Sequence, residues 1–161
     1  MNFKDFFKKF GLERISLSCS FASAEFTINN EDETAAWEMY VELITRVATQ
    51  KLPENFGDEV SALDSIYSIF QVTRDILKSH GRLAKSFTKI SIIILNQIIR
   101  PFTAKWHKQK NEGLLDTEDG KKMFRNDLLL IQDEIYSYCK MLSEIAKVED
   151  LIYLKEETNN V

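Results

Sequence analysis

The sequence contains few residues of the kinds that interrupt or cross-link a chain. Among 161 residues there are five glycines, two prolines, two cysteines and two histidines. So few glycines and prolines exclude a loop-rich fold and favour long regular elements. Cys19 and Cys139 are too few and too far apart for a disulfide framework or a zinc site. We therefore expect two buried free thiols, no metal and no other cofactor.

Long hydrophobic runs are also missing. The apolar part of the isoleucine-rich stretch 86–110 covers about ten residues, whereas a bilayer span needs ~20. The first residues alternate phenylalanine and lysine, unlike the apolar run of a signal peptide. These absences predict a cytoplasmic protein without a transmembrane segment.

One long segment has no negative charge. Between Asp75 and Glu112 there is no acidic residue, whereas eight lysines and arginines and both histidines lie there. The segment carries +8, so the remainder carries −12 to give the net charge of −4. Segregated charge of this kind can orient an anionic partner, such as an acidic protein or RNA. The alternative is a solvated basic face that packs near the acidic ends of other helices.

The apolar residues that are present recur at helical spacing. The stretch 86–110 is apolar on more than one face, which predicts a central helix buried between several neighbours. Three further helices are predicted from their apolar stripes: Trp37, Tyr40, Val41, Ile44 and Ala48; Leu63, Ile66, Tyr67, Phe70, Thr73 and Leu77; and Phe124, Leu128, Ile131, Ile135, Tyr138, Leu142 and Ile145. The last stripe has the 3.5-residue period of a bundle seam. Leu129 and Leu130 add a second apolar edge, which predicts a second neighbour for that helix.

The N-terminal part has two smaller elements. Four phenylalanines at helical spacing predict a short amphipathic helix within residues 1–11, docked on protein rather than on a membrane surface. Alternating apolar residues over 14–28 predict a small β-hairpin. The predicted fold is therefore a mainly α single domain over residues 1–161, in which the short helix and the hairpin precede a bundle of four long helices (32–154).

Most catalytic signatures are missing, but both histidines follow an arginine. RDILKSH runs from Arg74 to His80, and RPFTAKWH runs from Arg100 to His107. An arginine followed by four to six residues and a histidine resembles the motif of HEPN-type ribonucleases. That resemblance implies a metal-independent site, shared across a dimer, in which the histidine transfers a proton and the arginine holds phosphate charge.

Helical geometry treats the two pairs differently. On an ideal helix Arg74 and His80 are ~120° apart, whereas Arg100 and His107 are only ~20° from one face. Pro101 interrupts the second pair, because proline removes a backbone donor and kinks or restarts a helix. For each pair the structural alternative is an arginine near an acidic helix or a histidine at a helix end.

Three longer phrases carry a second resemblance. AAWEMYVELITR (35–46), SIYSIFQVTRDIL (65–77) and LNQIIRPFTAKWH (95–107) look like a family of small, largely uncharacterised bacterial proteins. The resemblance implies a bacterial, cytoplasmic, stand-alone domain and carries no activity over. A role beside other proteins in a defence or conflict system follows by analogy alone.

Two functions of different classes remain, and the sequence leaves open whether the protein is an enzyme. The leading hypothesis is a non-enzymatic interaction module or subunit, with a protein partner or a homo-oligomer, whose basic aromatic tip contains Arg100, Phe102, Lys105, Trp106 and Lys108. The alternative is a HEPN-like ribonuclease or toxin that uses Arg100, His107, Arg74 and His80.

Overall fold

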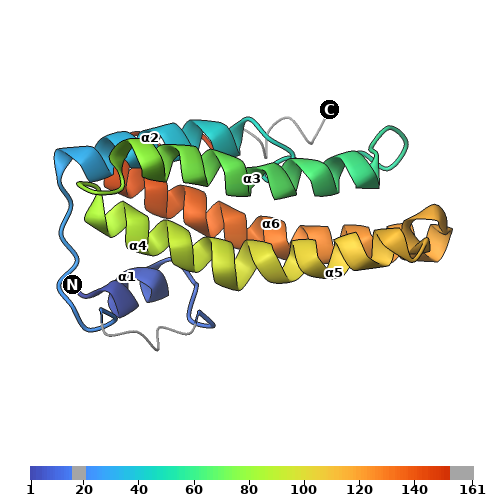
Figure 1. Cartoon of the computed structure of the whole chain (residues 1–161), viewed down its shortest axis with the longest axis horizontal. Coiled ribbons are helices and arrows are strands. Elements are labelled where there is room, and N and C mark those ends of the chain that lie inside the picture. Colours follow the sequence, from blue (N-terminus) through green and yellow to red (C-terminus); the bar gives the residue numbers. More distant parts are fainter. Residues whose placement is uncertain (16–20, 153–161) are drawn as a thin grey trace.

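The computed structural model describes residues 1–15 and 21–152, and it confirms the mainly α fold. In chain order its elements are α1 (Phe3–Lys9), α2 (Asn30–Ile44), α3 (Glu59–His80), α4 (Lys85–Ile94), the π-helical turn η1 (Leu95–Ile99), α5 (Arg100–Asn111), the 3₁₀ turn η2 (Leu114–Asp116) and α6 (Glu118–Ala146). The segments α4, η1 and α5 form one continuous column that runs along the molecule beside α3 and α6 (Figure 1). The four long helices of the predicted bundle are therefore α2, α3, this column and α6.

The predicted seam of α6 forms the centre of the core. All seven residues of the 3.5-residue repeat, from Phe124 to Ile145, are buried. The helix contacts α2, α3 and α5. Leu129 and Leu130, however, are 51% and 68% exposed, so the second apolar edge lies outside the core. The predicted second neighbour of α6 is therefore present, but Leu129 and Leu130 are not buried by it.

The buried face of α2 is rotated from the predicted stripe. The helix begins with a capping box between Asn29 and Asp32. Met39 and Tyr40 are buried, whereas Trp37 and Val41 are 46% and 36% exposed. The helix instead packs on its neighbours through a buried face that contains Ala35, Ala36, Met39, Tyr40 and Leu43, and this leaves the tryptophan outside.

The N-terminal helix docks on its own chain, as predicted. Phe3, Phe6 and Phe7 are all buried. The ammonium of Lys89 on α4 lies 5.0 Å from the centre of the Phe3 ring, and Lys9 forms an ion pair with Glu144 of α6 at 2.6 Å. Figure 1 shows α1 beside the first turns of α4, at one end of the bundle.

The segment after α1 differs from the predicted hairpin. Residues 16–20, which include Cys19 and much of the first predicted strand, lie outside the described residues. Residues 21–28 form no strand, and Glu25 makes only an isolated bridge to Asn2. The reason is that aromatic packing replaces strand pairing: Phe26 stacks on Phe6 at 4.0 Å between ring centres.

The start of α4 also corrects an expectation. Serine is a favoured N-cap residue, which predicts that Ser86 caps the central helix. The helix begins at Lys85 instead, and the Ser86 hydroxyl donates to the Thr27 carbonyl. The carboxylate of Asp32 accepts the Phe87 amide hydrogen bond at 2.9 Å. A side chain from α2 therefore does what a local cap does in an isolated helix.

Two expected absences concern only the described part of the chain. Over residues 1–15 and 21–152 no helix is long and apolar enough to cross a membrane. Cys139 is buried and forms no disulfide.

Candidate functional site

The π-helical turn η1 determines where α5 starts. The Arg100 amide donates to the Leu95 carbonyl, five residues back, instead of to a carbonyl four residues back. Pro101 then falls in the first turn of α5, where a missing amide donor is best tolerated. The helix thus restarts at the proline, as predicted. The extra residue in the π-helical turn rotates every following side chain about the helix axis.

One face of α5 belongs to the core. Phe102 and Trp106 are buried, and the Trp106 ring meets Phe124 edge-on at 5.0 Å. The Trp106 indole N–H donates to the Asp127 carboxylate at 3.0 Å, and Lys105 pairs with the same carboxylate at 2.6 Å. The expectation of an exposed aromatic tip is therefore wrong for Phe102 and Trp106, because both rings are needed to fill the space between α5 and α6.

The remaining predicted binding residues stay at the surface. Lys108 is exposed and lies 3.9 Å from Glu112 on its own helix. Arg100 is exposed as well. The basic side chains of the predicted tip are thus at the surface, whereas its two aromatic side chains are in the core.

The opposite face of α5 forms a hollow with α3, which we call the α3–α5 hollow. It has a volume of about 150 Å³ and is lined by Tyr67, Phe70, Arg74, Arg100, Thr103, Ala104 and His107. Three of the four residues predicted for a nuclease, Arg74, Arg100 and His107, therefore come together. The grouping differs from the two pairs in the sequence, because Arg74 lies with Arg100 and His107 and not with His80.

The two arginines share one aromatic ring. The guanidinium carbon of Arg100 lies 5.0 Å from the centre of the Phe70 ring, and that of Arg74 lies 5.9 Å from the same centre. Their hydrogen bonds go to neutral amides: Arg100 donates to Asn96 at 3.1 Å, and Arg74 donates to Gln71 at 3.4 Å. Within residues 1–15 and 21–152, neither arginine forms an ion pair with a carboxylate.

His107 completes the hollow from the next turn of α5. Its ring packs edge-on against Tyr67, with 4.8 Å between ring centres and 82° between planes. The Thr103 hydroxyl donates to the Ile99 carbonyl, so its oxygen can still accept a hydrogen bond. Guanidinium groups that match the geometry of a carboxylate or phosphate, beside an imidazole, form a site suited to one anionic group.

His80 lies elsewhere. Its Nδ1 is 3.1 Å from Glu31, and its Nε2 is 3.0 Å from Glu38. The hydrogen bond with Glu31 is the main cause that raises the pKa of the His80 imidazole, and the contact with Glu38 adds to it against the opposing effect of burial. His80 therefore links the end of α3 to α2 and does not share a site with Arg74, as their ~120° separation on a helix requires.

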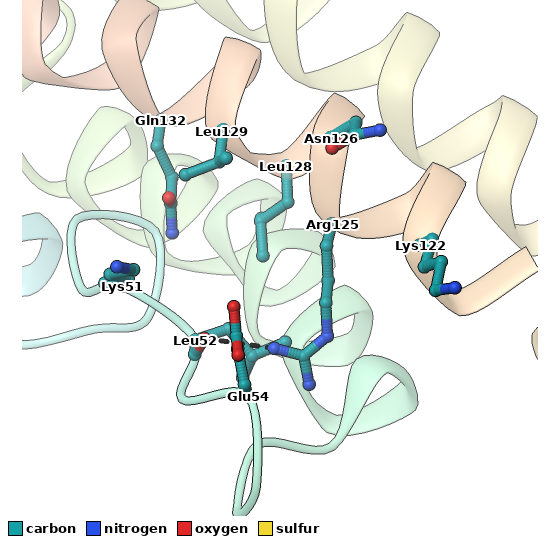
Figure 2. Close-up of a pocket in the computed structure, with 9 residues that line it drawn as sticks. All are labelled: Lys51, Leu52, Glu54, Lys122, Arg125, Asn126, Leu128, Leu129 and Gln132. Atoms are coloured by element: carbon teal, nitrogen blue, oxygen red, sulfur yellow. Dashed lines mark hydrogen bonds between the residues drawn. The ribbon is translucent and has the colours of Figure 1, made fainter. Parts of the chain in front are cut away.

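A second hollow, of about 220 Å³, lies between α6 and the loop that joins α2 to α3 (Figure 2). Arg125 extends from α6 beneath this loop, where it pairs with Glu59 at 2.7 Å. Its other donors reach the carbonyls of Leu52, Pro53 and Gly57 at 3.0–3.1 Å. Four of the five N–H donors of the Arg125 guanidinium are thus used by groups of the fold, whereas Arg74 and Arg100 each donate to one amide oxygen.

Sequence reasoning missed two features of these sites. It placed Tyr67 in the core, whereas this side chain is 52% exposed and flanks His107. It gave no role to Arg125, which has no local motif and whose partners are 66 to 73 residues away. Among the described residues, no group of three or more histidine, cysteine, aspartate and glutamate side chains could hold a metal ion.

No protein-family model, no curated protein and no solved structure matches the chain. Both resemblances seen in the sequence therefore stay predictions, and the site is interpreted from its own residues.

Proposed function

We propose that this protein is a cytoplasmic interaction module that binds an acidic segment of a partner protein through the α3–α5 hollow. The observation that supports it is the pair of guanidinium groups, Arg74 and Arg100, that share the Phe70 ring without a carboxylate partner among the described residues. Two like charges held near one apolar ring repel each other more than they would in bulk water. An anion between them removes that repulsion.

The expected gain in binding free energy is large enough for specific recognition of an anionic group. Hydrogen bonds to charged groups contribute about 1.5–3 kcal/mol each, roughly twice the contribution of neutral ones. The arginines are pre-positioned on Phe70 by cation–π contact, so less side-chain freedom is lost on binding. His107 and the oxygen of Thr103 then fix the orientation of the bound group.

The test is a binding titration with a fluorescent ten-residue peptide of alternating glutamate and glycine. Arg74→Ala and Arg100→Ala should each weaken binding at least ~10-fold, which corresponds to ~1.4 kcal/mol. Arg82→Ala is the matched control, because Arg82 is an exposed arginine in the turn after α3 and does not line the hollow. Equal losses in all three variants would indicate general charge attraction and would contradict the proposal.

A second function, metal-independent ribonuclease, is favoured by one observation. His107 and Arg100 lie in the same hollow on one α-helix, as the HEPN-like motif requires. Imidazole can transfer a proton near neutral pH, and guanidinium can hold phosphate charge. In this case the full chain should cleave labelled single-stranded RNA in the presence of a chelator. His107→Ala should abolish cleavage with unchanged melting temperature, and His80→Ala should leave the cleavage rate intact.

A further inference from the structure

A third hollow lies on the outer surface between α2 and α3. Its volume is about 360 Å³, and it is lined by Trp37, Glu38, Val41, Glu42, Val72, Asp75 and Ile76. The two helices run side by side in Figure 1, and residues of both line the hollow. None of these residues lines the α3–α5 hollow.

The floor of this groove is apolar and accessible. Trp37 and Val41 are four residues apart on α2, and Val72 and Ile76 are four residues apart on α3, so each pair forms a short row along its helix. Trp37 is 46% exposed although it is one of the largest apolar side chains in the chain. Its ring stacks on Tyr40 at 6.2 Å, which holds it at the groove edge.

The rim of the groove is acidic. Glu38, Glu42 and Asp75 are its charged lining residues, and α2 contains no lysine or arginine. One oxygen of each carboxylate already accepts a hydrogen bond, from His80, Arg46 and Gln71 respectively. The second oxygen of each has no hydrogen-bond donor among the described residues.

Two neighbouring residues of α3 separate this groove from the basic hollow. Arg74 lines the hollow toward α5, whereas Asp75 lines the groove toward α2. Consecutive side chains on a helix project ~100° apart, so α3 presents a basic surface on one side and an acidic surface on the other. A ligand drawn by the charge of one surface is therefore repelled by the other.

We infer that the α2–α3 groove receives a basic amphipathic helix of a partner protein. Apolar side chains of such a helix, spaced three and four residues apart, match the two rows on the floor. Its lysines or arginines then meet the free oxygens of the rim, and this charge complementarity selects a basic helix over an acidic one. Aromatic residues such as Trp37 carry much of the contact energy in grooves of this kind.

The test uses the full chain with Arg74→Ala and Arg100→Ala, so that the α3–α5 hollow does not bind the acidic peptide, and two synthetic helical peptides of 18 residues. Both carry leucine along one face, and the other positions are lysine in one peptide and glutamate in the other. The lysine peptide should bind at least ~10-fold more tightly than the glutamate peptide, with affinity that falls as salt is raised. Equal affinity for the two peptides, or no binding of the lysine peptide, would overturn the inference.

Variants locate the site. Trp37→Ala should weaken binding of the lysine peptide at least ~10-fold. Leu130→Ser is the matched control, since Leu130 is an exposed apolar residue on α6 and should have little effect. Asp75→Lys should weaken the lysine peptide and strengthen the glutamate peptide. An unchanged affinity in Trp37→Ala contradicts the inference, as does self-association of the chain that Trp37→Ala abolishes, because the occupant is then a second copy.

Discussion

Arg125 and the arginine pair Arg74 and Arg100 have opposite surroundings. Arg125 of α6 pairs with a buried glutamate and donates to three backbone carbonyls of the loop between α2 and α3. Arg74 and Arg100 lie over the Phe70 ring and donate only to neutral amides. The Arg125 guanidinium holds the loop against α6, whereas those of Arg74 and Arg100 have N–H donors left for a ligand.

The difference shows how the hydrogen-bond partners of an arginine separate a structural role from a functional one. An arginine whose donors all meet protein acceptors stabilises the loop that supplies them. An arginine without a carboxylate partner contributes little to folding, so its position needs another explanation. The same distinction applies to α5, where Trp106 is satisfied within the core and His107 faces the hollow.

The largest effect is expected on the core side of α5. Trp106→Ala removes a fully buried ring and its hydrogen bond to Asp127, so it should lower the free energy of unfolding by about 3–5 kcal/mol. Urea unfolding followed by circular dichroism measures this change. Trp37→Ala is the matched control, because this half-exposed tryptophan should lose no more than about 1 kcal/mol. Similar losses for the two variants would show that Trp106 is not a core residue.

The next largest loss of stability is expected at Arg125, in contrast to Arg74 and Arg100. Arg125→Ala leaves the Glu59 carboxylate and three carbonyls without their donor, and it should destabilise the protein by about 2–4 kcal/mol. Arg125→Lys keeps the charge but lacks the planar fork, so it should recover less than half of the loss. Thermal unfolding of the three proteins gives the comparison. A fully stable Arg125→Ala protein would contradict a structural role for this residue.

A smaller effect depends on pH through His80. The pKa of this imidazole is raised by its hydrogen bonds with Glu31 and Glu38, so its protonated form stabilises the fold. That stabilisation is complete below the ordinary histidine pKa of about 6.5 and is lost as the pH rises through the raised value. The free energy of unfolding should fall by up to ~1 kcal/mol from pH 6 to 8, relative to His80→Gln.

The control for the pH experiment is His107→Gln, which keeps His80 and both carboxylates. It should retain the pH dependence of the wild-type chain. A wild-type curve that parallels the His80→Gln curve over the whole range would show that the histidine does not link α2 to α3.

The smallest effect on stability is expected at the α3–α5 hollow. Arg74→Ala and Arg100→Ala each remove one cation–π contact and one hydrogen bond to an amide, which should change the free energy of unfolding by less than about 1 kcal/mol. Together with the binding losses proposed above, this result would complete the contrast with Arg125. A loss of more than about 2 kcal/mol of unfolding free energy in either variant would show that this arginine stabilises the fold, as Arg125 does.

Repeating patterns made the helices predictable from the sequence. The seam of α6 was correct at every position because a 3.5-residue repeat over three heptads leaves one possible buried face. The prediction for Trp37 was wrong because hydrophobicity alone does not set the rotation of a helix, and the buried face of α2 contains Ala35, Ala36 and Met39 instead. The hairpin was wrong over 21–28 because alternation does not supply a partner strand.

The candidate site was only half predictable. Arg100 and His107 share a helix, and their seven-residue separation places them on one face. Arg74 reaches the same hollow only through the packing of α3 on α5, which no local pattern encodes. The ~120° separation of His80 from Arg74 on α3 follows from helix geometry, whereas its partners Glu38 and Glu31, 42 and 49 residues away, depend on tertiary structure.

The central claim is that Arg74 and Arg100 hold an anion together, and the side-chain Nε–H signals of the arginines test it most directly. The full chain is titrated with inorganic phosphate and followed by two-dimensional ¹H–¹⁵N NMR. We expect the Arg74 and Arg100 signals to shift along one saturable curve, while the signals of Arg125 and exposed Arg82 stay unchanged. Loss of the Arg74 shift in Arg100→Ala would confirm a shared site. Shifts of the same size at Arg82, or none at Arg74 and Arg100, would contradict the claim.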